Sequence, residues 1–198
     1  IKEFDILKKY GSQTPTKSVI LDYKKSLGNE AVELYKKTGR SPFPWQEKMI
    51  NDLFAMNDED LWTHSKFGYA VPRRNGKTEV VYMAELWGLF HGLNILHTAH
   101  RISTSHSSFE KLKKYLEDIG LVDKENFSSI KAKGQERIEL TEYGGVIQFR
   151  TRTSTGGLGE GFDMLVIDEA QEYTDDQESA LKYTVTDSDN PMTIMCGT

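Results

Sequence analysis

The sequence has few of the features that mark secreted, membrane-spanning or DNA-coating proteins. A single cysteine, Cys196, excludes an internal disulfide and suits a reducing cytoplasm. There is no apolar run near about 18 residues and no cleavable signal, so neither membrane insertion nor secretion is indicated. Positive charge is not in excess, because 25 Lys and Arg stand against 30 Asp and Glu, giving a net charge of -5. Any DNA contact therefore requires a local basic patch or assembly around the duplex.

What the chain does contain is enough apolar sequence for one substantial core. Of its 198 residues, 37% are hydrophobic and 28% are charged, and one domain is the default at this length. Helices are predicted at 29–37, 45–56, 78–90, 105–119 and 174–183, the last opening on a Thr174 and Gln177 capping box. Strands are predicted within 61–71 and at 94–99, 137–141, 146–150, 164–168 and 193–196. This alternation, with one hairpin at 137–150, predicts a three-layer α/β fold with a mostly parallel central sheet.

Gly76-Lys77-Thr78 lies between a strand-like run at 67–71 and the helical run at 78–90. A Gly-rich turn in this position points backbone N–H groups and the positive end of the helix dipole at one spot, which suits a polyphosphate. Lys77 would reach the β- and γ-phosphates, and Thr78 would offer its hydroxyl to Mg²⁺. The motif predicts a site for ATP with Mg²⁺.

A second motif, Asp168-Glu169, follows the apolar run 164–167. Such a run is typical of a strand buried on both faces, which delivers its terminal carboxylate to the edge of the sheet where ligands bind. Asp168 would hold the metal through its shell of ligands, and Glu169 would orient and polarise the attacking water.

The phosphate loop departs from the usual pattern at its first glycine, which is Val71 in this chain. The alternative interpretation is an ordinary surface turn and an unrelated acidic strand end. The strand before the loop, the helix after it and the apolar run ending in Asp168 and Glu169 favour the nucleotide site.

The segment 71–78 resembles the variant phosphate loop of the large terminase subunit of tailed bacteriophages, in which arginine occupies the loop and the first glycine is often lost. Three further segments are similar to motifs of that family. Pro42-Phe43-Pro44-Trp45-Gln46 is similar to the adenine-recognition segment, Asp168-Glu169-Ala170 to the acidic pair, and Cys196-Gly197-Thr198 to the coupling motif that ties hydrolysis to movement. Residues 1–41 carry no matching motif.

The resemblance implies roles for further residues of the nucleotide site. Gln46 would hydrogen-bond the adenine edge with Phe43 or Trp45 packed nearby; the alternative is that Pro-Trp-Gln simply opens a helix. An arginine at Arg73 would add charge to the phosphate cradle, where guanidinium suits bidentate contact. The neighbouring Arg74 and Asn75 would complete the loop, unless one of the two arginines is only solvated. Thr198 would lie where loss of the γ-phosphate is sensed.

The resemblance also implies an arginine finger, supplied by a neighbouring subunit, between the phosphate loop and the acidic pair. Arg150 and Arg152 precede the glycine-rich stretch 154–161, and Arg101 follows the predicted strand at 94–99. Arg152 is the preferred candidate. Strand-end arginines bonded to local carboxylates are an equally good interpretation.

Other polar groups have simpler explanations. Without a metal-binding pattern of the usual spacing, His97, His100 and His106 are better interpreted as structural histidines than as metal ligands. Lysines on the predicted helix at 105–119 and after it could contact a phosphodiester backbone, but a solvated face is the default: Lys111, Lys113, Lys114, Lys131 and Lys133.

We therefore expect residues 42–198 to form an ATPase domain of the ASCE or RecA-like P-loop class, and residues 1–41 a helical extension. We also expect a fragment, because the chain begins at Ile1 rather than methionine and ends at Thr198, directly after a predicted strand. The resemblance implies a C-terminal nuclease of RNase H-like fold in the whole protein, and no such segment is in this chain.

Three functions are compatible with these motifs. The preferred one is an ATP-driven motor that moves double-stranded DNA into a viral capsid from the cytoplasm of a bacterial host. The resemblance implies a homo-oligomeric ring, a portal protein and a small terminase subunit as partners. The alternative is a helicase-like ATPase, although Gln171 stands where the commonest helicases have histidine or aspartate. A nucleotide-dependent assembly module without turnover is disfavoured by Lys77 and Glu169.

Overall fold

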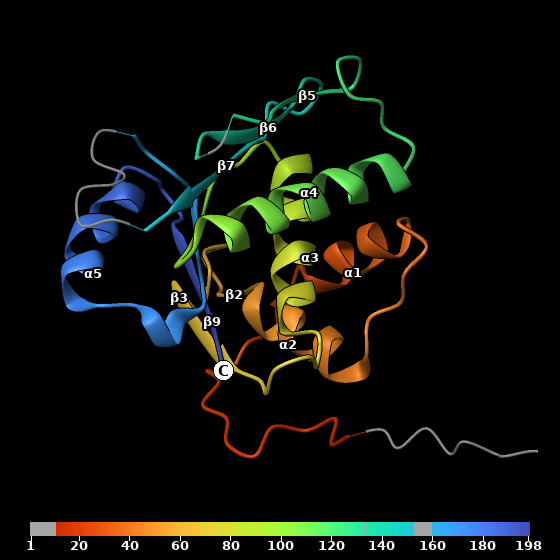
Figure 1. Ribbon diagram of the computed structural model, residues 1–198. Coiled ribbons are helices and arrows are strands. Elements are labelled where there is room, and N and C mark those ends of the chain that lie inside the picture. Colours follow the sequence, from red (N-terminus) through yellow and green to blue (C-terminus); the bar gives the residue numbers. More distant parts are fainter. Residues whose placement is uncertain (1–10, 133, 153–159) are drawn as a thin grey trace, which may run out of the picture.

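The computed structural model describes residues 11–132, 134–152 and 160–198. Seven strands form one sheet in the order β3-β9-β8-β4-β7-β6-β5 (Figure 1). Their bounds are β3 Lys66–Ala70, β4 Asn94–Ala99, β5 Phe127–Ile130, β6 Glu136–Leu140, β7 Val146–Thr151, β8 Met164–Asp168 and β9 Met192–Gly197. The first five strands in that order are parallel, and β6 and β5 extend the sheet as antiparallel neighbours. The predicted α/β fold with a mostly parallel sheet is confirmed.

The strand order decides which residues meet at the edge of the sheet. The strand before the phosphate loop, β3, is separated from the acidic strand β8 by β9, the last strand of the chain. The strands that precede the phosphate loop and the acidic pair are therefore not direct neighbours. Because the three strands are parallel, their carboxyl ends lie together, and ligands of open α/β sheets bind at that edge.

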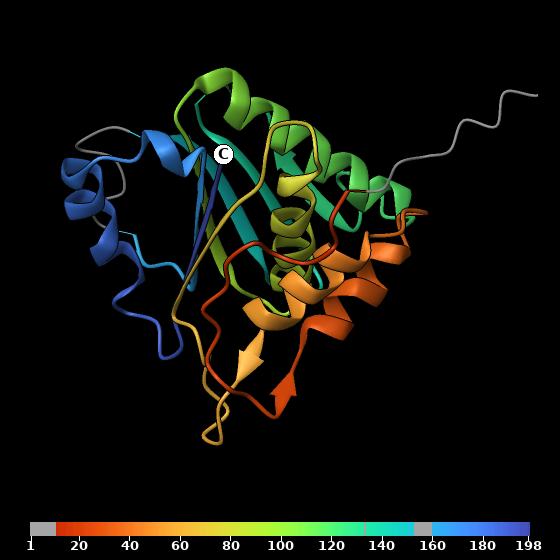
Figure 2. The same cartoon turned by 90° about the horizontal axis from the view of Figure 1, so that it is seen from below.

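Helices cover both faces of the sheet. On one face α3 (Lys77–Phe90) and α4 (Ile102–Asp118) lie side by side, with α1 (Gly28–Lys36) and α2 (Pro44–Leu53) outside α3 (Figures 1 and 2). On the other face lie α5 (Asp175–Leu181) and the 3₁₀ turn η2 (Lys182–Val185). Alternating residues of β8 supply both cores: Val166 packs on the α3 side, and Leu165 and Ile167 pack with Leu181 and Val185.

Helix α3 is buried on nearly every side, as its apolar sequence predicts. Ten of its residues are buried, from Val80 to Leu89. It contacts β9, β8 and β4 beneath it and α1, α2 and α4 around it. A helix held this firmly gives its first residue, Lys77, a fixed position.

Several boundaries differ from the predictions. The predicted helix at 45–56 was too long, because α2 ends at Leu53 and Ala55–Met56 forms the short strand β2, paired with β1 (Lys25–Ser26). Strand β5 was not predicted, and α4 begins three residues earlier, at Ile102 rather than Ser105. The capping box of Thr174 and Gln177 is present at the start of α5.

Helix α1 shares the main core with the sheet. Its residues Ala31, Val32 and Tyr35 are buried in the same cluster as α3. The helix contacts both α2 and α3. In the described part of the chain, no helix has the length and apolar character needed to cross a membrane.

Candidate functional site

A cavity of about 530 Å³ opens at the carboxyl edge of the parallel strands. It is lined by the phosphate loop, the first turns of α3, the N-terminal half of α4 and the ends of β8 and β9. The lining residues predicted from the sequence are Arg73, Arg74, Gly76, Lys77, Thr78, Asp168, Glu169 and Thr198. Residues from motifs that lie far apart in the sequence therefore line one cavity.

The phosphate loop reverses direction through two left-handed residues, Arg74 with φ 64° and Gly76 with φ 80°. Asn75 braces this turn, because its Nδ2 donates to the carbonyl oxygens of Pro72 and Arg73 at 3.0 and 3.1 Å. Arg73 and Arg74 are exposed at the mouth of the cavity. The loop thus carries two solvent-facing guanidinium groups in front of Lys77.

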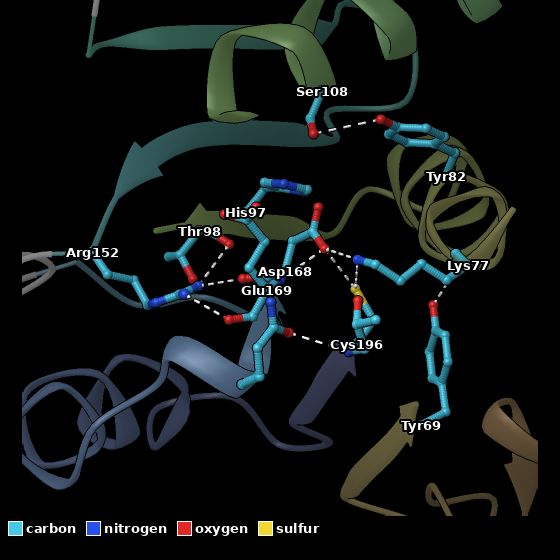
Figure 3. Close-up of polar contacts among 12 residues, drawn as sticks. Tyr69, Lys77, Tyr82, His97, Thr98, Ser108, Arg152, Asp168, Glu169 and Cys196 are labelled. Carbon is cyan, nitrogen blue, oxygen red and sulfur yellow. Dashed lines mark hydrogen bonds and ion pairs between the residues drawn. The ribbon is translucent and has the colours of Figure 1, made fainter. Parts of the chain in front are cut away.

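Lys77 reaches across the cavity to the acidic strand. Its Nζ lies 2.7 Å from Asp168 Oδ1 and 3.9 Å from Cys196 Sγ (Figure 3). The carbonyl oxygen of Lys77 accepts a hydrogen bond of 2.8 Å from the Tyr69 hydroxyl. The lysine is thereby fixed at its backbone by β3 and at its ammonium by β8.

Tyr69, Cys196 and Asp168 stand in one row across three neighbouring strands, because the register pairs Tyr69 with Cys196 and Cys196 with Asp168. Asp168 Oδ1 accepts from Cys196 Sγ at 3.0 Å and from the N–H of Glu169 at 2.8 Å, besides Lys77. Burial alone would raise the pKa of Asp168, but the positive charges of His97 and Lys77 outweigh it and hold the pKa below its ordinary value. Asp168 is therefore kept as a carboxylate.

Glu169 combines a strained backbone with a carboxylate oxygen that has no hydrogen-bond partner among the described residues. Its backbone lies in the left-handed region at φ 55°, which is strained for glutamate. Its Oε2 is buried and has no hydrogen-bond partner among the described residues. Glu169 also lines the cavity, and a carboxylate with an oxygen that has no partner is suited to polarise a water molecule.

The end of β9 is tied to the acidic pair by Gln171, a residue that motif reasoning did not select. Gln171 lies in the 3₁₀ turn η1 (Ala170–Glu172), and its Oε1 accepts from the N–H of Thr198 at 3.2 Å. Both residues line the cavity. Its position two residues after Glu169 could have indicated this contact, because a turn directly after β8 passes the end of the neighbouring strand β9.

Gln46 is not in the cavity lining. It is 3% exposed, and its amide is bonded at both ends: Oε1 accepts from the N–H of Phe43 at 2.7 Å and Nε2 donates to the carbonyl of Gly76 at 2.8 Å. Trp45 is half-buried against the main core. The adenine roles of Gln46 and Trp45 stay predictions, and the observed role of Gln46 is to join α2 to the phosphate loop.

Arg152, the preferred finger candidate, lies inside its own chain. It is 6% exposed, and its guanidinium donates to the carbonyl oxygens of Thr98, Asp168 and Glu169 at 3.2, 2.6 and 3.1 Å (Figure 3). In this position its guanidinium is bonded to carbonyl groups of its own chain, and its role as a trans finger stays a prediction. Arg150 forms an ion pair of 2.8 Å with Glu160, as the alternative interpretation of strand-end arginines expects. Residues 153–159 of the glycine-rich stretch lie outside the described residues.

A buried ion pair stands behind the site. His97 Nδ1 on β4 lies 2.5 Å from Glu85 Oε1 on α3, and both side chains are fully buried. His97 Nε2 and Glu85 Oε2 have no partner in the described structure. His97 was expected to be a structural histidine; its partner Glu85 was missed because the helical run around it is almost entirely apolar.

The residues present fit ATP with Mg²⁺. The hydroxyl of Thr78 and the carboxylate of Asp168 line the same cavity and are oxygen ligands of the kind that Mg²⁺ prefers. Lys77, Arg73 and Arg74 supply positive charge for phosphate groups, and Glu169 lines the same cavity. The arrangement has the parts needed to cleave a phosphoanhydride with water.

The sequence matches no protein-family profile and no curated protein. Among solved structures, the fold is similar to large terminases of bacteriophages. The HK97 bacteriophage large terminase aligns with a TM-score of 0.70 and 14% identity over 88% of this chain. The large terminase ATPase domain of Thermus phage P74-26 gives 0.61 and 15% over 84%, and covers 68% of that domain. The large terminase of a thermophilic bacteriophage, in complex with ADP, gives 0.55 and 14% over 86%.

These alignments establish the fold. The chain has the α/β P-loop architecture of the large terminase ATPase domains, at an identity of 14 to 15%. It spans 38% of the HK97 terminase and 37% of the ADP-bound terminase.

Proposed function

We propose that this chain is the ATPase motor domain of a phage-type large terminase subunit. The observation that carries the proposal is the meeting of Lys77, Asp168 and Glu169 at one cavity, with Lys77 Nζ 2.7 Å from Asp168 Oδ1. The fold shared with large terminases supports it, as does the ADP held by one of those structures. The proposed reaction is hydrolysis of ATP to ADP and phosphate.

In the proposed mechanism Lys77 exchanges partners. Its ammonium leaves Asp168 and takes the β- and γ-phosphates, while Arg73 and Arg74 approach them from the mouth of the cavity. Asp168 and the Thr78 hydroxyl would hold Mg²⁺, which supplies charge neutralisation between the phosphates when bound. Glu169 orients a water molecule for in-line attack on the γ-phosphorus, and ADP leaves from the opposite side.

Conversion of hydrolysis into movement is assigned to the link between η1 and β9. Gln171 follows Glu169 and accepts the N–H of Thr198, so a shift of Glu169 on loss of the γ-phosphate would be passed to the end of β9. The proposed load is double-stranded DNA moved into a procapsid by a homo-oligomeric ring, with a portal protein and a small terminase subunit as partners. With a net charge of -5, this contact is proposed to come from a local basic patch or from assembly around the duplex.

The test is ATP hydrolysis per molecule measured against protein concentration, with Glu169→Gln as the blank. Glu169→Gln is expected to bind ATP and lose at least about 100-fold in turnover, since general acid–base assistance contributes on this scale. Lys77→Ala is expected to bind ATP poorly. Normal turnover by Glu169→Gln would overturn the proposal. Activity that rises with concentration supports a site completed by a neighbour, whereas real but constant activity favours the helicase-like alternative.

A further inference from the structure

The cavity has a second wall that the proposed mechanism does not use. It belongs to α4, which lies beside α3 on the same face of the sheet (Figures 1 and 2). Three residues of α4 line the cavity, namely Thr104, Ser107 and Lys111. Their spacing, i, i+3 and i+7, places them on one stripe of the helix. Two hydroxyl groups and an ammonium group thus border the cavity that holds Lys77.

Lys111 differs from its neighbouring lysines in its partners. Lys113 Nζ lies 2.7 Å from Asp123, and Lys114 Nζ lies 3.2 Å from Asp118. Lys111 has no ion pair within residues 11–132, 134–152 and 160–198. It is half-buried, and its Nζ stands 5.3 Å from the centre of the Tyr115 ring. Lys111 therefore lines the cavity without a carboxylate at ion-pair distance among the described residues.

Tyr115 ties this lysine to the helix that follows the phosphate loop. The Tyr115 hydroxyl donates to Glu79 Oε2 at 2.6 Å, and the Tyr35 hydroxyl donates to the same oxygen at 2.6 Å. Glu79 directly follows Thr78 in the first turn of α3. The Arg40 guanidinium lies 4.3 Å from the centre of the Tyr115 ring. The ring under Lys111 is thus fixed relative to the phosphate loop.

The charges on the two walls indicate what fits between them. Lys77 and the exposed Arg73 and Arg74 stand on the wall formed by the loop. Lys111 stands on the opposite wall, formed by α4. Glu79, Asp168 and Glu169 also line the cavity, but the cations stand on both walls. A ligand with several negative charges can therefore contact a cation on each side. On α4, Ser107 donates its hydroxyl to the Ser103 carbonyl at 2.8 Å, which leaves Thr104 and Lys111 as donors for a ligand.

We propose that Lys111 is a second phosphate-binding side chain of the nucleotide site, which contacts the polyphosphate chain from the α4 wall, with the Thr104 hydroxyl beside it. This inference rests on the proposed function of the cavity as a nucleotide site. It assigns α4 a direct role in ligand binding, in addition to its packing in the hydrophobic core.

The test compares Lys111→Ala with Lys114→Ala by calorimetric titration of MgATP and of inorganic triphosphate, a probe without base or ribose. Lys114 is the matched control because it lies on the same helix, is paired with Asp118 and is absent from the cavity lining. Lys111→Ala is expected to weaken both ligands about tenfold, roughly the effect of one charge-assisted hydrogen bond. Lys114→Ala is expected to bind like the wild type, and Lys111→Arg to retain most of the affinity.

Equal affinities of Lys111→Ala and Lys114→Ala would overturn the inference. Loss of ATP affinity with unchanged triphosphate affinity would also overturn it, since Lys111 would then contact the base or ribose. Lys77→Ala in the same titrations separates this inference from the function on which it rests. If the wild type binds neither ligand, both fall; if it binds them through Lys77 and Lys111→Ala changes nothing, only the role of Lys111 falls.

Discussion

Gln46 Nε2 donates a hydrogen bond of 2.8 Å to the carbonyl oxygen of Gly76, which joins the start of α2 to the end of the phosphate loop. The other end of the same amide accepts from the N–H of Phe43 and caps α2. A single buried side chain therefore sets the distance between the Pro-Trp-Gln segment and the loop. Any nucleotide that contacts both segments depends on this spacing.

Gly76→Ala is expected to damage the loop for two reasons. The residue has φ 80°, and an added Cβ would lie 2.8 Å from Gln46 Nε2. Strain of this kind costs about 1 to 3 kcal/mol, and the displaced loop should weaken ATP binding at least about tenfold. Gly39→Ala is the control, because Gly39 has φ 79° with no atom within 4 Å of the added Cβ. Urea unfolding and ATP titration measure both effects, and equal behaviour of the two variants would show that the contact with Gln46 does not matter.

The Glu85 and His97 pair makes a prediction about stability. Burial raises the pKa of the Glu85 carboxyl. For His97, burial acts in the lowering direction, but the nearby Glu85 outweighs it and raises the pKa. The two groups thus depend on each other within an apolar interior. Glu85→Met and His97→Leu are each expected to lower the free energy of unfolding by about 3 to 5 kcal/mol, because each leaves one buried polar group without its partner.

The double variant Glu85→Met/His97→Leu should lose less than either single variant, since an apolar pair of similar volume leaves no orphaned group. Urea unfolding of the four proteins gives the coupling energy directly. Losses that simply add would mean that the two side chains contribute independently. In that case the contact between Glu85 and His97 would contribute nothing to the free energy of unfolding.

The pattern of apolar residues was sufficient to predict the parallel strands and α3. The signal was clearest for β8 and α3, which are buried on nearly every side and have almost uniformly apolar sequences. It failed at β5, where Phe127 and Ile130 flank two serines in a stretch too short to stand out. It also failed at Ala55–Met56, which pairs with Lys25–Ser26 across a long stretch of sequence. Strand pairing between distant segments is not encoded in local periodicity.

Some residues of the candidate site could likewise be predicted from the sequence, and others could not. Lys77, Thr78, Asp168 and Glu169 could be predicted because their chemistry requires fixed residue types at a strand end and a helix start. The positions of Gln46 and Arg152 could not, since a long polar side chain is free to turn toward solvent or back to its own chain. Both turn inward here, Gln46 toward the carbonyl oxygen of Gly76 and Arg152 toward the carbonyl oxygen of Asp168.

Asp168 gives a prediction about pH. Its pKa is held below the ordinary value, because the charges of His97 and Lys77 outweigh burial. A carboxyl group with a lowered pKa in the folded state stabilises the fold above its unfolded pKa of about 3.9. That contribution is lost as the pH falls through the folded pKa. Between about pH 5 and about pH 2, where carboxyl groups titrate, the unfolding free energy of the wild type should fall more steeply than that of Asp168→Asn. Parallel curves would contradict this account of Asp168.

Arg152 can be assigned to its own chain or to a neighbour by mixing variants. In the structure its guanidinium donates to the carbonyls of Asp168 and Glu169 within one chain, so Arg152→Ala should misplace the acidic pair and lower turnover at least about tenfold, the scale of one lost charge-assisted hydrogen bond. A trans finger predicts that Arg152→Ala regains activity when mixed with Glu169→Gln, since the latter would supply an intact arginine to a site with an intact glutamate.

The geometry predicts no such recovery, because each mixed subunit still lacks one residue of its own site. Hydrolysis per active site, measured across mixing ratios at fixed total protein, decides between the two. Recovery at intermediate ratios would require Arg152 to leave the carbonyls of its own chain and enter a neighbour. It would also mean that Arg152, which is 6% exposed in the single chain, becomes exposed when subunits assemble.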